Sequence, residues 1–409
     1  YFGVNWDRKS DYDDYNNDGF GDDINLSRFS IFNKWNIYRQ SKKEFIISAR
    51  YYFEDRRNGV KEYLSNNNYK KIRGDSQVYG ESIYTNRFEL FGKYEFDFTD
   101  GFEVNYSFSK HDQNSYYGSD YYQANQDIFF SQFTLDRNYG NHDLLFGASI
   151  KNNLYDDNTI ATQSVVNGTI INKNSNQLIP GLLIQDQYKP SEKISLIGGL
   201  RVDHFNEHGF IYAPSFHLKY NPGKWLSLRL NAGTGFRLVN LFTEDHAFIT
   251  GQREVKILEE LKPEESKSLI FNANYIYTGL NGSGNIDLDL FYTYFSNKII
   301  PNYDNQNFII YGNSDGHAYS KGISGALNHT FLNGVSFSLT FNHQIVRYTE
   351  IENNKESFFE MEHSPKWTGG FNLKVPINKK WSINSSSNYV GVMQLPTVFE
   401  MKDNGEISS

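Results

Sequence analysis

Residues 84–98 read Tyr-Thr-Asn-Arg-Phe-Glu-Leu-Phe-Gly-Lys-Tyr-Glu-Phe-Asp-Phe, and this stretch decides the fold. One alternating set is aromatic or apolar apart from Asn86 and Gly92, and the other is charged or polar apart from Phe91. Alternation with a period of two predicts a β-strand with one apolar and one polar face. The run is much longer than the roughly 5–6 residues of a typical strand in a soluble protein.

The same alternation recurs along the chain. It is found in residues 45–53, 102–109, 286–294, 335–341 and 367–375. Many long strands of this kind predict an all-β protein built on one large antiparallel sheet.

The composition excludes several classes of protein. Aromatic residues make up 17% of the 409 residues, which excludes a disordered chain. The mean hydropathy is −0.62, and no apolar run approaches the roughly 18 residues of a membrane-spanning helix. The chain has no cysteine, so it offers no disulfide, thiol nucleophile or zinc–thiolate site, and its net charge of −8 gives no electrostatic case for nucleic acid. A transmembrane β-barrel combines many aromatics with low mean hydropathy, because alternate residues face lipid and a polar lumen.

The connections between the predicted strands alternate in length. Tight turns are expected at 40–43, 99–101, 138–141, 190–192, 221–224, 280–284, 332–333 and 377–379. Longer polar stretches lie between them, at 7–23, 54–80, 110–125, 152–177, 236–264, 298–315 and 350–365, with a shorter one at 205–211. Outer-membrane barrels have short periplasmic turns and long extracellular loops in this order.

Counting strands in this way gives about 17, from Phe2–Trp6 to Trp381–Val390, in a single domain. The first strand leads into a long loop and therefore runs outward. With an odd number of antiparallel strands the last strand also runs outward, so residues 394–409 are expected in an extracellular loop. A closed bacterial barrel has an even number of strands. We therefore interpret residues 1–409 as one incomplete barrel domain.

Two segments resemble a family signature. Residues 233–244 read Gly-Thr-Gly-Phe-Arg-Leu-Val-Asn-Leu-Phe-Thr-Glu, and residues 261–266 read Leu-Lys-Pro-Glu-Glu-Ser. They resemble the barrel signature of TonB-dependent outer-membrane receptors, Gly-Phe-Arg-Ala-Pro-x-x-x-Glu-Leu followed by Leu-x-Pro-Glu-x-Ser, with Leu238-Val239 in place of Ala-Pro. The signature positions are Gly235, Phe236, Arg237, Asn240, Phe242, Glu244, Leu261, Pro263, Glu264 and Ser266.

The resemblance implies that the chain corresponds to about strands 3–19 of a barrel of about 22 strands. It implies an outer-membrane receptor, not an enzyme, that imports a scarce bulky ligand: an iron-siderophore, cobalamin or haem. The implied partners are that ligand, outer-membrane lipid, a surface lipoprotein, and the TonB–ExbB–ExbD complex acting through a plug domain outside residues 1–409. The alternatives are a passive porin or adhesin barrel and a secreted β-rich enzyme or lectin.

The first long loop contains a candidate calcium site. Asp14, Asn16, Asp18 and Asp22 stand at the oxygen-ligand positions of a calcium loop, and the Phe20 carbonyl stands at a fifth. Position twelve is Asn25 instead of a bidentate glutamate, so the pattern is not a complete EF-hand. A solvated acidic turn is the alternative. The only cofactor expected is therefore structural calcium; no catalytic cofactor or catalytic residue is expected.

Histidine and arginine supply the other candidate residues. His246 follows the signature, and haem receptors of the family carry a histidine there in a related motif, so it is a weak candidate ligand residue. His204 and His208 are four residues apart, a spacing that favours a metal pair on a helix but not here, where no helix is expected. Arg237 is expected in the lumen, paired with a plug carboxylate or with an acid of the barrel wall.

Overall fold

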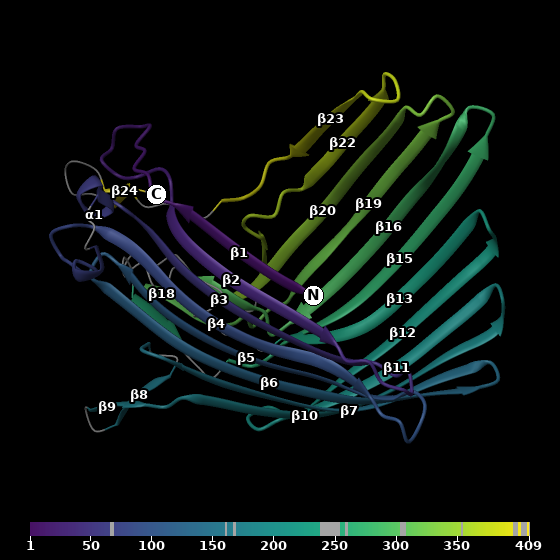
Figure 1. Cartoon of the computed structure of the whole chain (residues 1–409), viewed down its shortest axis with the longest axis horizontal. Coiled ribbons are helices and arrows are strands. Elements are labelled where there is room, and N and C mark those ends of the chain that lie inside the picture. The colour runs from purple at the N-terminus through teal and green to yellow at the C-terminus, as the bar shows by residue number, and fades with distance from the viewer. Residues whose placement is uncertain are drawn as a thin grey trace.

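In the computed structural model the chain forms one large antiparallel β-sheet, rolled into a trough (Figure 1). The structure describes residues 1–65, 69–159, 162–166, 169–237, 254–257, 261–302, 308–352, 355–395, 400–401 and 407–408. Within these residues β1 pairs only with β2, and β23 pairs only with β22, so these two strands are the edges of the sheet. Figure 1 shows the open side of the trough between them.

The large sheet has 18 strands, joined in sequence order. They are β1 (Phe2–Lys9), β2 (Asn25–Asn36), β3 (Phe45–Gly59), β4 (Gly80–Glu95), β5 (Phe102–Tyr117), β6 (Asp120–Tyr139), β7 (His142–Asp157), β10 (Ser175–Ser191), β11 (Ile194–Phe205), β12 (Gly209–Gly223), β13 (Leu226–Arg237), β15 (Glu264–Gly279), β16 (Gly282–Ser296), β19 (Ala318–Phe331), β20 (Ser336–Glu352), β21 (Lys355–Glu360), β22 (Trp367–Pro376) and β23 (Ser382–Val390). Because β21 and β22 pair with successive parts of β20, they occupy one position, which agrees with the expected count of about 17.

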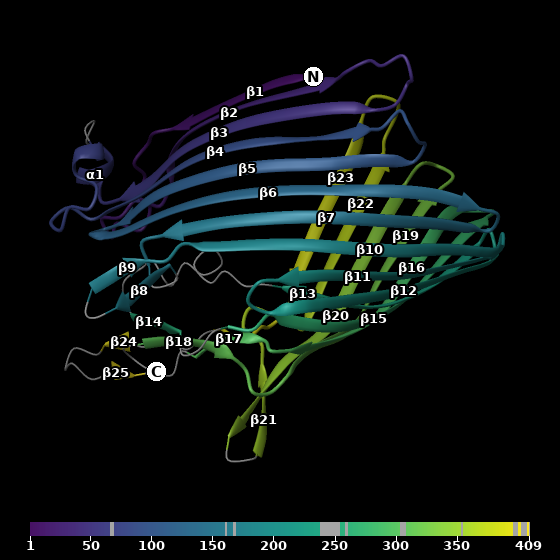
Figure 2. The ribbon, with the colours of Figure 1, turned by 90° about the horizontal axis from the view of Figure 1, so that it is seen from below.

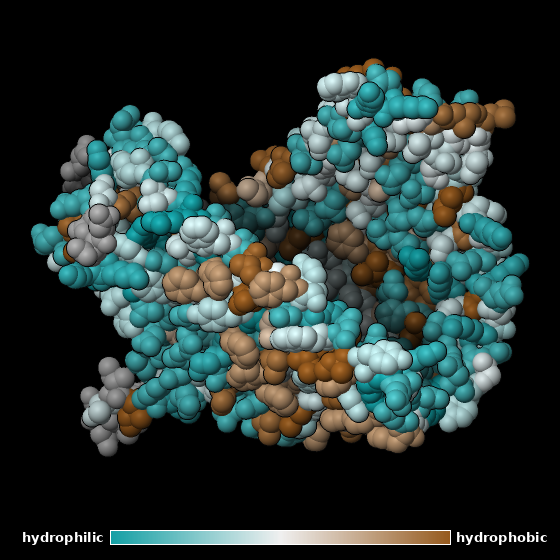
Figure 3. All heavy atoms as spheres, viewed as in Figure 1, coloured by the Kyte–Doolittle hydropathy of each residue, from teal (hydrophilic) through white to brown (hydrophobic). Residues whose placement is uncertain are grey.

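The alternation in the sequence becomes the two faces of this sheet. Ala49, Leu90, Phe108 and Phe129 are paired in one row across β3 to β6, and directly paired residues point to the same face. This outer face is apolar yet uncovered: Phe129 is 44% exposed and Leu182 66%. Figure 3 shows apolar residues gathered on the outside of the trough, over the region of β4 to β6. Such a face requires an apolar surrounding, which confirms the predicted transmembrane barrel class.

The two ends of the strands differ. The expected tight turns lie at one end, the turn end, and the longer connections lie at the other, the loop end (Figure 2). Trp35, Trp225 and Trp381 lie beside turns, and Trp367 begins β22 near the loop end. Indole rings favour the boundary between lipid and water, so these positions fit aromatic girdles at both boundaries.

Two expected loops are shorter than predicted. Residues 110–125 are not a loop: β5 and β6 continue through them and meet at Gly118–Ser119, with Tyr117 paired to Asp120. Beyond the apolar band both faces of a strand meet water, so the alternation that reveals a strand disappears from the sequence. Similarly, β11 and β12 extend into 205–211 and leave a turn of only 206–208.

Small elements fill the remaining connections at the loop end. They are α1 (Lys61–Ser65), a 3-10 helix (Tyr69–Lys71), the hairpin of β8 (Gln163–Val166) and β9 (Thr169–Asn172), a small sheet of β14 (Glu254–Ile257), β17 (Ile299–Asn302) and β18 (Phe308–Asn313), and the pair β24 (Glu400–Met401) and β25 (Ile407–Ser408). Among the described residues no helix has the length and apolarity needed to span a membrane.

Candidate functional site

The inner face of the sheet forms the wall of the lumen, and its first part is rich in ion pairs. These pairs connect β2 with β3, β3 with β4, and β4 with β5. The charged side chains therefore link neighbouring strands, and they also face the water of the lumen. Examples are Arg28 Nη2–Glu54 Oε2 at 2.5 Å, Arg87 Nη2–Glu89 Oε1 at 2.8 Å, Arg50 Nη1–Glu89 Oε2 at 3.5 Å and Lys93 Nζ–Glu103 Oε2 at 2.8 Å.

The opposite part of the wall is lined by amides, hydroxyls and two adjacent carboxylates. The Asn272 amide donates to Asp287 Oδ1 at 2.7 Å and to Asp289 Oδ1 at 2.8 Å, and the Asn274 amide donates to Asp287 Oδ2 at 2.6 Å. These bonds join β15 to β16. They also supply hydrogen-bond donors to the Asp287 and Asp289 carboxylates, neither of which forms an ion pair within the described residues. The lumen wall therefore offers hydrogen-bonding groups on both sides, interrupted by inward-facing rings such as Phe91 and Phe130, and Figure 3 shows the molecule hollowed in front of it.

An ion pair with a buried carboxylate and a part-exposed arginine lies in the middle of the wall, on β11. Arg201 Nε and Nη2 both donate to the Asp203 carboxylate at 2.7 Å, and Nη2 also donates to Ser149 Oγ at 3.1 Å. Asp203 is only 1% exposed. Gly181 on β10 is paired with Asp203 and makes room for it: a Cβ there would lie 2.2 Å from Asp203 Oδ1. No motif in the sequence points to this group.

The two halves of the sequence signature meet at Glu264. Arg237 at the end of β13 pairs with Glu264 at the start of β15, with Nε 2.9 Å and Nη2 2.8 Å from Oε2. The other oxygen, Oε1, accepts the Ile299 amide at 2.9 Å and lies 3.2 Å from Lys298 Nζ. Glu264 is 4% exposed. The structure thus contains the barrel-wall partner for Arg237; a plug partner stays a prediction.

The other described signature residues support this joint. Gly235 is paired with Ser266, whose hydroxyl donates to the Gly235 carbonyl at 3.4 Å. A Cβ on Gly235 would lie 3.2 Å from Ser266 Oγ, so this contact favours glycine. Pro263 is buried beside Glu264, and Leu261 is half-buried. The signature residues Asn240, Phe242 and Glu244, and also His246, lie outside the described residues.

Asn313 ties three loop-end segments to the same joint. Its Oδ1 accepts the Lys262 amide at 2.7 Å, and its Nδ2 donates to the carbonyls of Lys262 at 3.0 Å and Asn297 at 2.7 Å. Asn297 has a positive φ of 53°, which turns the chain out of β16. Neither Asn313 nor Lys298 belongs to a recognisable motif, so the sequence alone does not predict their part in this joint.

The proposed calcium ligands form a hydrogen-bonded loop. The Asp14 carboxylate accepts the Asp18 amide at 3.2 Å and the Gly19 amide at 3.0 Å, while Asp18 Oδ1 accepts the Phe20 amide at 2.8 Å. Asp22 Oδ2 accepts the Tyr15 amide at 2.6 Å. In the part of the chain that the structure describes, no group of three or more His, Asp or Glu side chains is arranged to hold a metal ion. The calcium interpretation, which also uses Asn16 and a carbonyl, stays a prediction.

This first loop packs on the second. The Gly21 amide donates to the Gly59 carbonyl at 3.0 Å, and the Asn58 side chain donates to the Gly21 carbonyl at 2.9 Å. A small core of Tyr63, Leu64 and Tyr69, contacted by Tyr12, lies beneath them. Burial raises the pKa of the Tyr69 hydroxyl, and its hydrogen bond to the Asp55 carboxylate raises it further. The two loops therefore form one layer at the loop end.

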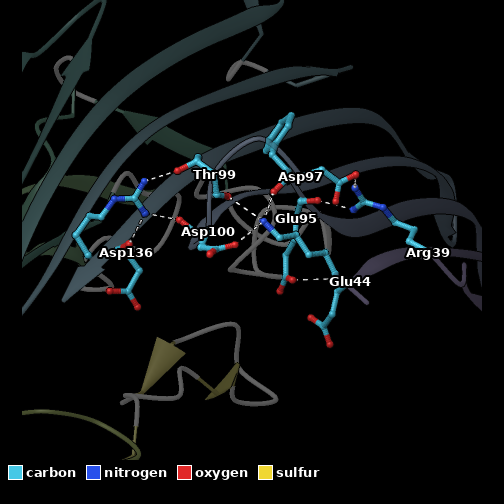
Figure 4. Close-up of polar contacts among 10 residues, drawn as sticks. Arg39, Glu44, Glu95, Asp97, Thr99, Asp100 and Asp136 are labelled. Carbon is cyan, nitrogen blue, oxygen red and sulfur yellow. Dashed lines mark hydrogen bonds and ion pairs between the residues drawn. The ribbon is translucent and has the colours of Figure 1, made fainter. Parts of the chain in front are cut away.

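Ion pairs also connect neighbouring turns at the turn end (Figure 4). Lys43 Nζ lies 2.8 Å from Asp100 Oδ1 and donates to the Thr99 carbonyl at 3.1 Å. Arg39 pairs with Asp97, and Arg137 donates to Thr99 Oγ1 at 2.5 Å. These contacts link the turns that follow β2, β4 and β6.

Four further histidines lie on the barrel wall or in its turns. His204 packs edge-on against Phe210, with ring centroids 4.8 Å apart, and His208 lies in the turn after β11. His142 Nδ1 lies 2.8 Å from Asp186 Oδ2 and its ring stacks on Tyr188. His217 Nδ1 lies 2.8 Å from Asn231 Oδ1 on the lumen wall.

The turn-end pairs give a pH-dependent prediction. Hydrogen bonds from Ser41 and Arg39 hold the pKa of Asp97 below its ordinary value, and the hydrogen bond from Lys43 does the same for Asp100. A lowered folded-state pKa stabilises the fold above the unfolded-state value of about 3.9, and this contribution is lost as the pH falls below it. Asp97→Asn/Asp100→Asn should be less stable than the parent protein at pH 7, with a difference that shrinks below about pH 4. Urea unfolding at both pH values measures it; a constant difference would contradict it.

A rolled antiparallel sheet with an exposed apolar outer face, a polar lumen and unequal ends defines an outer-membrane type of β-barrel. The family model described as TonB dependent receptor-like, beta-barrel matches residues 2–398. The chain belongs to this family, which consists of outer-membrane transport receptors and not enzymes.

Solved structures share this fold. The FrpB iron transporter of Neisseria meningitidis superposes with a TM-score of 0.67 at 13% identity, over 100% of this chain and 67% of FrpB. The siderophore receptor PirA of Pseudomonas aeruginosa gives 0.65 at 13% identity, over 90% of this chain and 62% of PirA. The ferric enterobactin receptor PfeA of the same organism gives 0.65 at 15% identity, over 94% and 60%. The chain thus spans about three fifths of these two receptors. No curated protein matches the chain in sequence.

Proposed function

We propose that the protein containing this barrel is an outer-membrane receptor that captures a ferric siderophore at its loop end and imports it with energy from the TonB system. The observation that carries the proposal is the family match over residues 2–398. Solved proteins of the same fold bear names of siderophore or iron transport, which favours iron-siderophore over cobalamin and haem as the ligand class. The implied location is the outer membrane, with the TonB–ExbB–ExbD complex acting through a plug domain.

The lumen supports a transport role. A sheet of this many strands encloses a space wider than its own side chains fill, so it must conduct or hold a plug. Its wall carries hydrogen-bonding groups on both sides, in the ion pairs of β2–β5 and in the Asn272 and Asp287 group of β15–β16. Such a wall suits polar contacts with a plug and with a bulky polar ligand.

The test uses the full-length protein in its own cell. Deleting its gene should abolish energy-dependent uptake of one ferric siderophore under iron limitation, and loss of TonB should have the same effect. Direct binding of that siderophore to the purified receptor should survive the loss of TonB. Uptake that persists without TonB would favour a passive porin, and an attachment defect with normal uptake would favour an adhesin.

We also propose that calcium binds the first long loop through Asp14, Asn16, Asp18, the Phe20 carbonyl and Asp22. Calcium prefers six to eight oxygen ligands, and this segment supplies alternate oxygens on a loop that already turns at Gly19, with φ of 87°. Because this loop packs on the second loop, calcium should order both.

Calcium should protect residues 10–24 and 60–79 from proteolysis in the full-length receptor. Asp18→Ala should abolish the protection, because it removes a ligand at the centre of the pattern. Asp11→Ala, in the same loop but outside the pattern, is the matched control. Limited proteolysis with calcium or with a chelator measures the effect; equal protection of both variants would contradict the site.

A further inference from the structure

Lys321 lies among apolar and aromatic residues on the outer face of the sheet, close to the loop end. It is paired across the strands with Tyr292 and Ile345, in a row that also contains Leu269. The adjacent row toward the turn end consists of Phe271, Leu290, Ile323, His343 and Trp367. A lysine in such a row stands at the upper border of the apolar band.

An apolar groove of about 520 Å³ runs beside Lys321. Its outer-face lining includes Leu230, Leu269, Phe271, Leu290 and Ile323. Leu269 is 49% exposed and Leu290 44%, so the groove is open to the surroundings of the barrel. Its apolar lining, contributed by β13, β15, β16, β19 and β20, suits a hydrocarbon chain.

Cations surround the upper end of this groove. The next row toward the loop end contains Lys267, Tyr294, Tyr319 and Arg347. Lys321 Nζ lies 5.2 Å from the centre of the Tyr319 ring, and neither Lys321 nor Lys267 forms an ion pair within the described residues.

The neighbouring acids do not neutralise this end of the groove. Arg347 and Lys366 share the single carboxylate of Glu360, at 3.5 and 2.7 Å. Glu265, on the same face of β15, lies two residues farther toward the loop end than Lys267. The border of the apolar band between β15 and β20 thus carries excess positive charge.

We propose that this surface, defined by Lys321, Lys267, Arg347 and the groove, binds a membrane lipid with a phosphorylated headgroup. The phosphate contacts Lys321, flanked by Lys267 and Arg347, and one acyl chain occupies the groove. Charge complementarity selects this occupant: a second copy of the same face would bring cation against cation, whereas a lipid supplies the anion and the hydrocarbon together. The inference rests on the proposed outer-membrane location but not on the transported ligand.

The test is native mass spectrometry of the full-length receptor, extracted in mild detergent and titrated with a phosphorylated lipid. Lys321→Ala should lower the fraction of lipid-bound receptor and weaken binding by about fivefold. A basic residue near a membrane surface contributes about 1 kcal/mol, which corresponds to about this change in affinity. Lys374→Ala, which removes a lumen-facing lysine of β22, should leave binding unchanged. A lipid with the same chains and no phosphate should bind weakly to all variants.

A second variant tests the groove separately from the charge. Ile323→Trp places a large ring in the groove and should weaken lipid binding with every cation in place. Binding that is unchanged in both Lys321→Ala and Ile323→Trp would overturn the proposal, as would dimers through this face in analytical ultracentrifugation. Ligand uptake should stay normal in both variants, so failure here is distinguishable from failure of the transport proposal.

Discussion

Replacing Glu264 by alanine is expected to lower the free energy of unfolding by about 2 kcal/mol, because the buried Ile299 amide loses its acceptor while Arg237 and Lys298 lose their counter-ion. Glu264 accepts hydrogen bonds from Arg237 and from the Ile299 amide, and it pairs with Lys298. The change therefore acts on β13, β15 and β17 at once. Denaturant unfolding of the full-length receptor in lipid vesicles measures it.

Two further variants distinguish the effect of the Glu264 charge from the effect of any substitution at this end of β15. Glu264→Gln keeps an oxygen for the Ile299 amide but removes the charge, so it should lie between the parent protein and Glu264→Ala in stability. Glu265→Ala changes the exposed neighbour on the outer face and should alter the free energy of unfolding by no more than about 0.5 kcal/mol. If Glu264→Ala were no more harmful than Glu265→Ala, the joint would not stabilise the barrel.

The sequence predicted the strands best in the segments that have lipid on one face and the lumen on the other. In residues 84–98 one face must be apolar and the other polar, so the period of two is visible. The prediction was wrong at 110–125, where β5 and β6 carry polar residues or tyrosines on both faces at every position except Gly118 and Ala124, so no period of two is visible. The turn itself had a local signal, since Gly118 has a φ of 59°, a conformation that glycine adopts readily.

The candidate site was predicted only in part, for a related reason. The signature identified Arg237 and Glu264, but the pairing of these residues depends on the register between β13 and β15, which the intervening loop conceals. Lys298 and Asn313 come from the next connection, and nothing in their local sequence points to Glu264 or Lys262. Asp203 and Gly181 likewise meet only because β10 and β11 pair in one register.

Asp203→Ala is expected to be the other strongly destabilising change, by about 2 kcal/mol, because it leaves the Arg201 guanidinium without the carboxylate that accepts two of its hydrogen bonds. Asp203 is nearly inaccessible to solvent, whereas the Arg201 side chain is 37% exposed, so water hydrates part of the guanidinium and limits the cost. Asp289→Ala removes a lumen carboxylate that pairs with no cation in the described part of the chain, and it should cost about 1 kcal/mol. Denaturant unfolding in vesicles compares the two variants.

The same carboxylate explains why residue 181 is a glycine, and a double-mutant cycle tests that explanation. Gly181→Ala alone should destabilise the barrel by about 2 kcal/mol, because the new Cβ would lie 2.2 Å from Asp203 Oδ1. In the Asp203→Ala background the nearest oxygen is gone, so the same change should cost clearly less, with Ser149 Oγ at 2.9 Å as the nearest remaining atom. A strictly additive pair would show that Gly181 is required for a reason other than room for the Asp203 side chain.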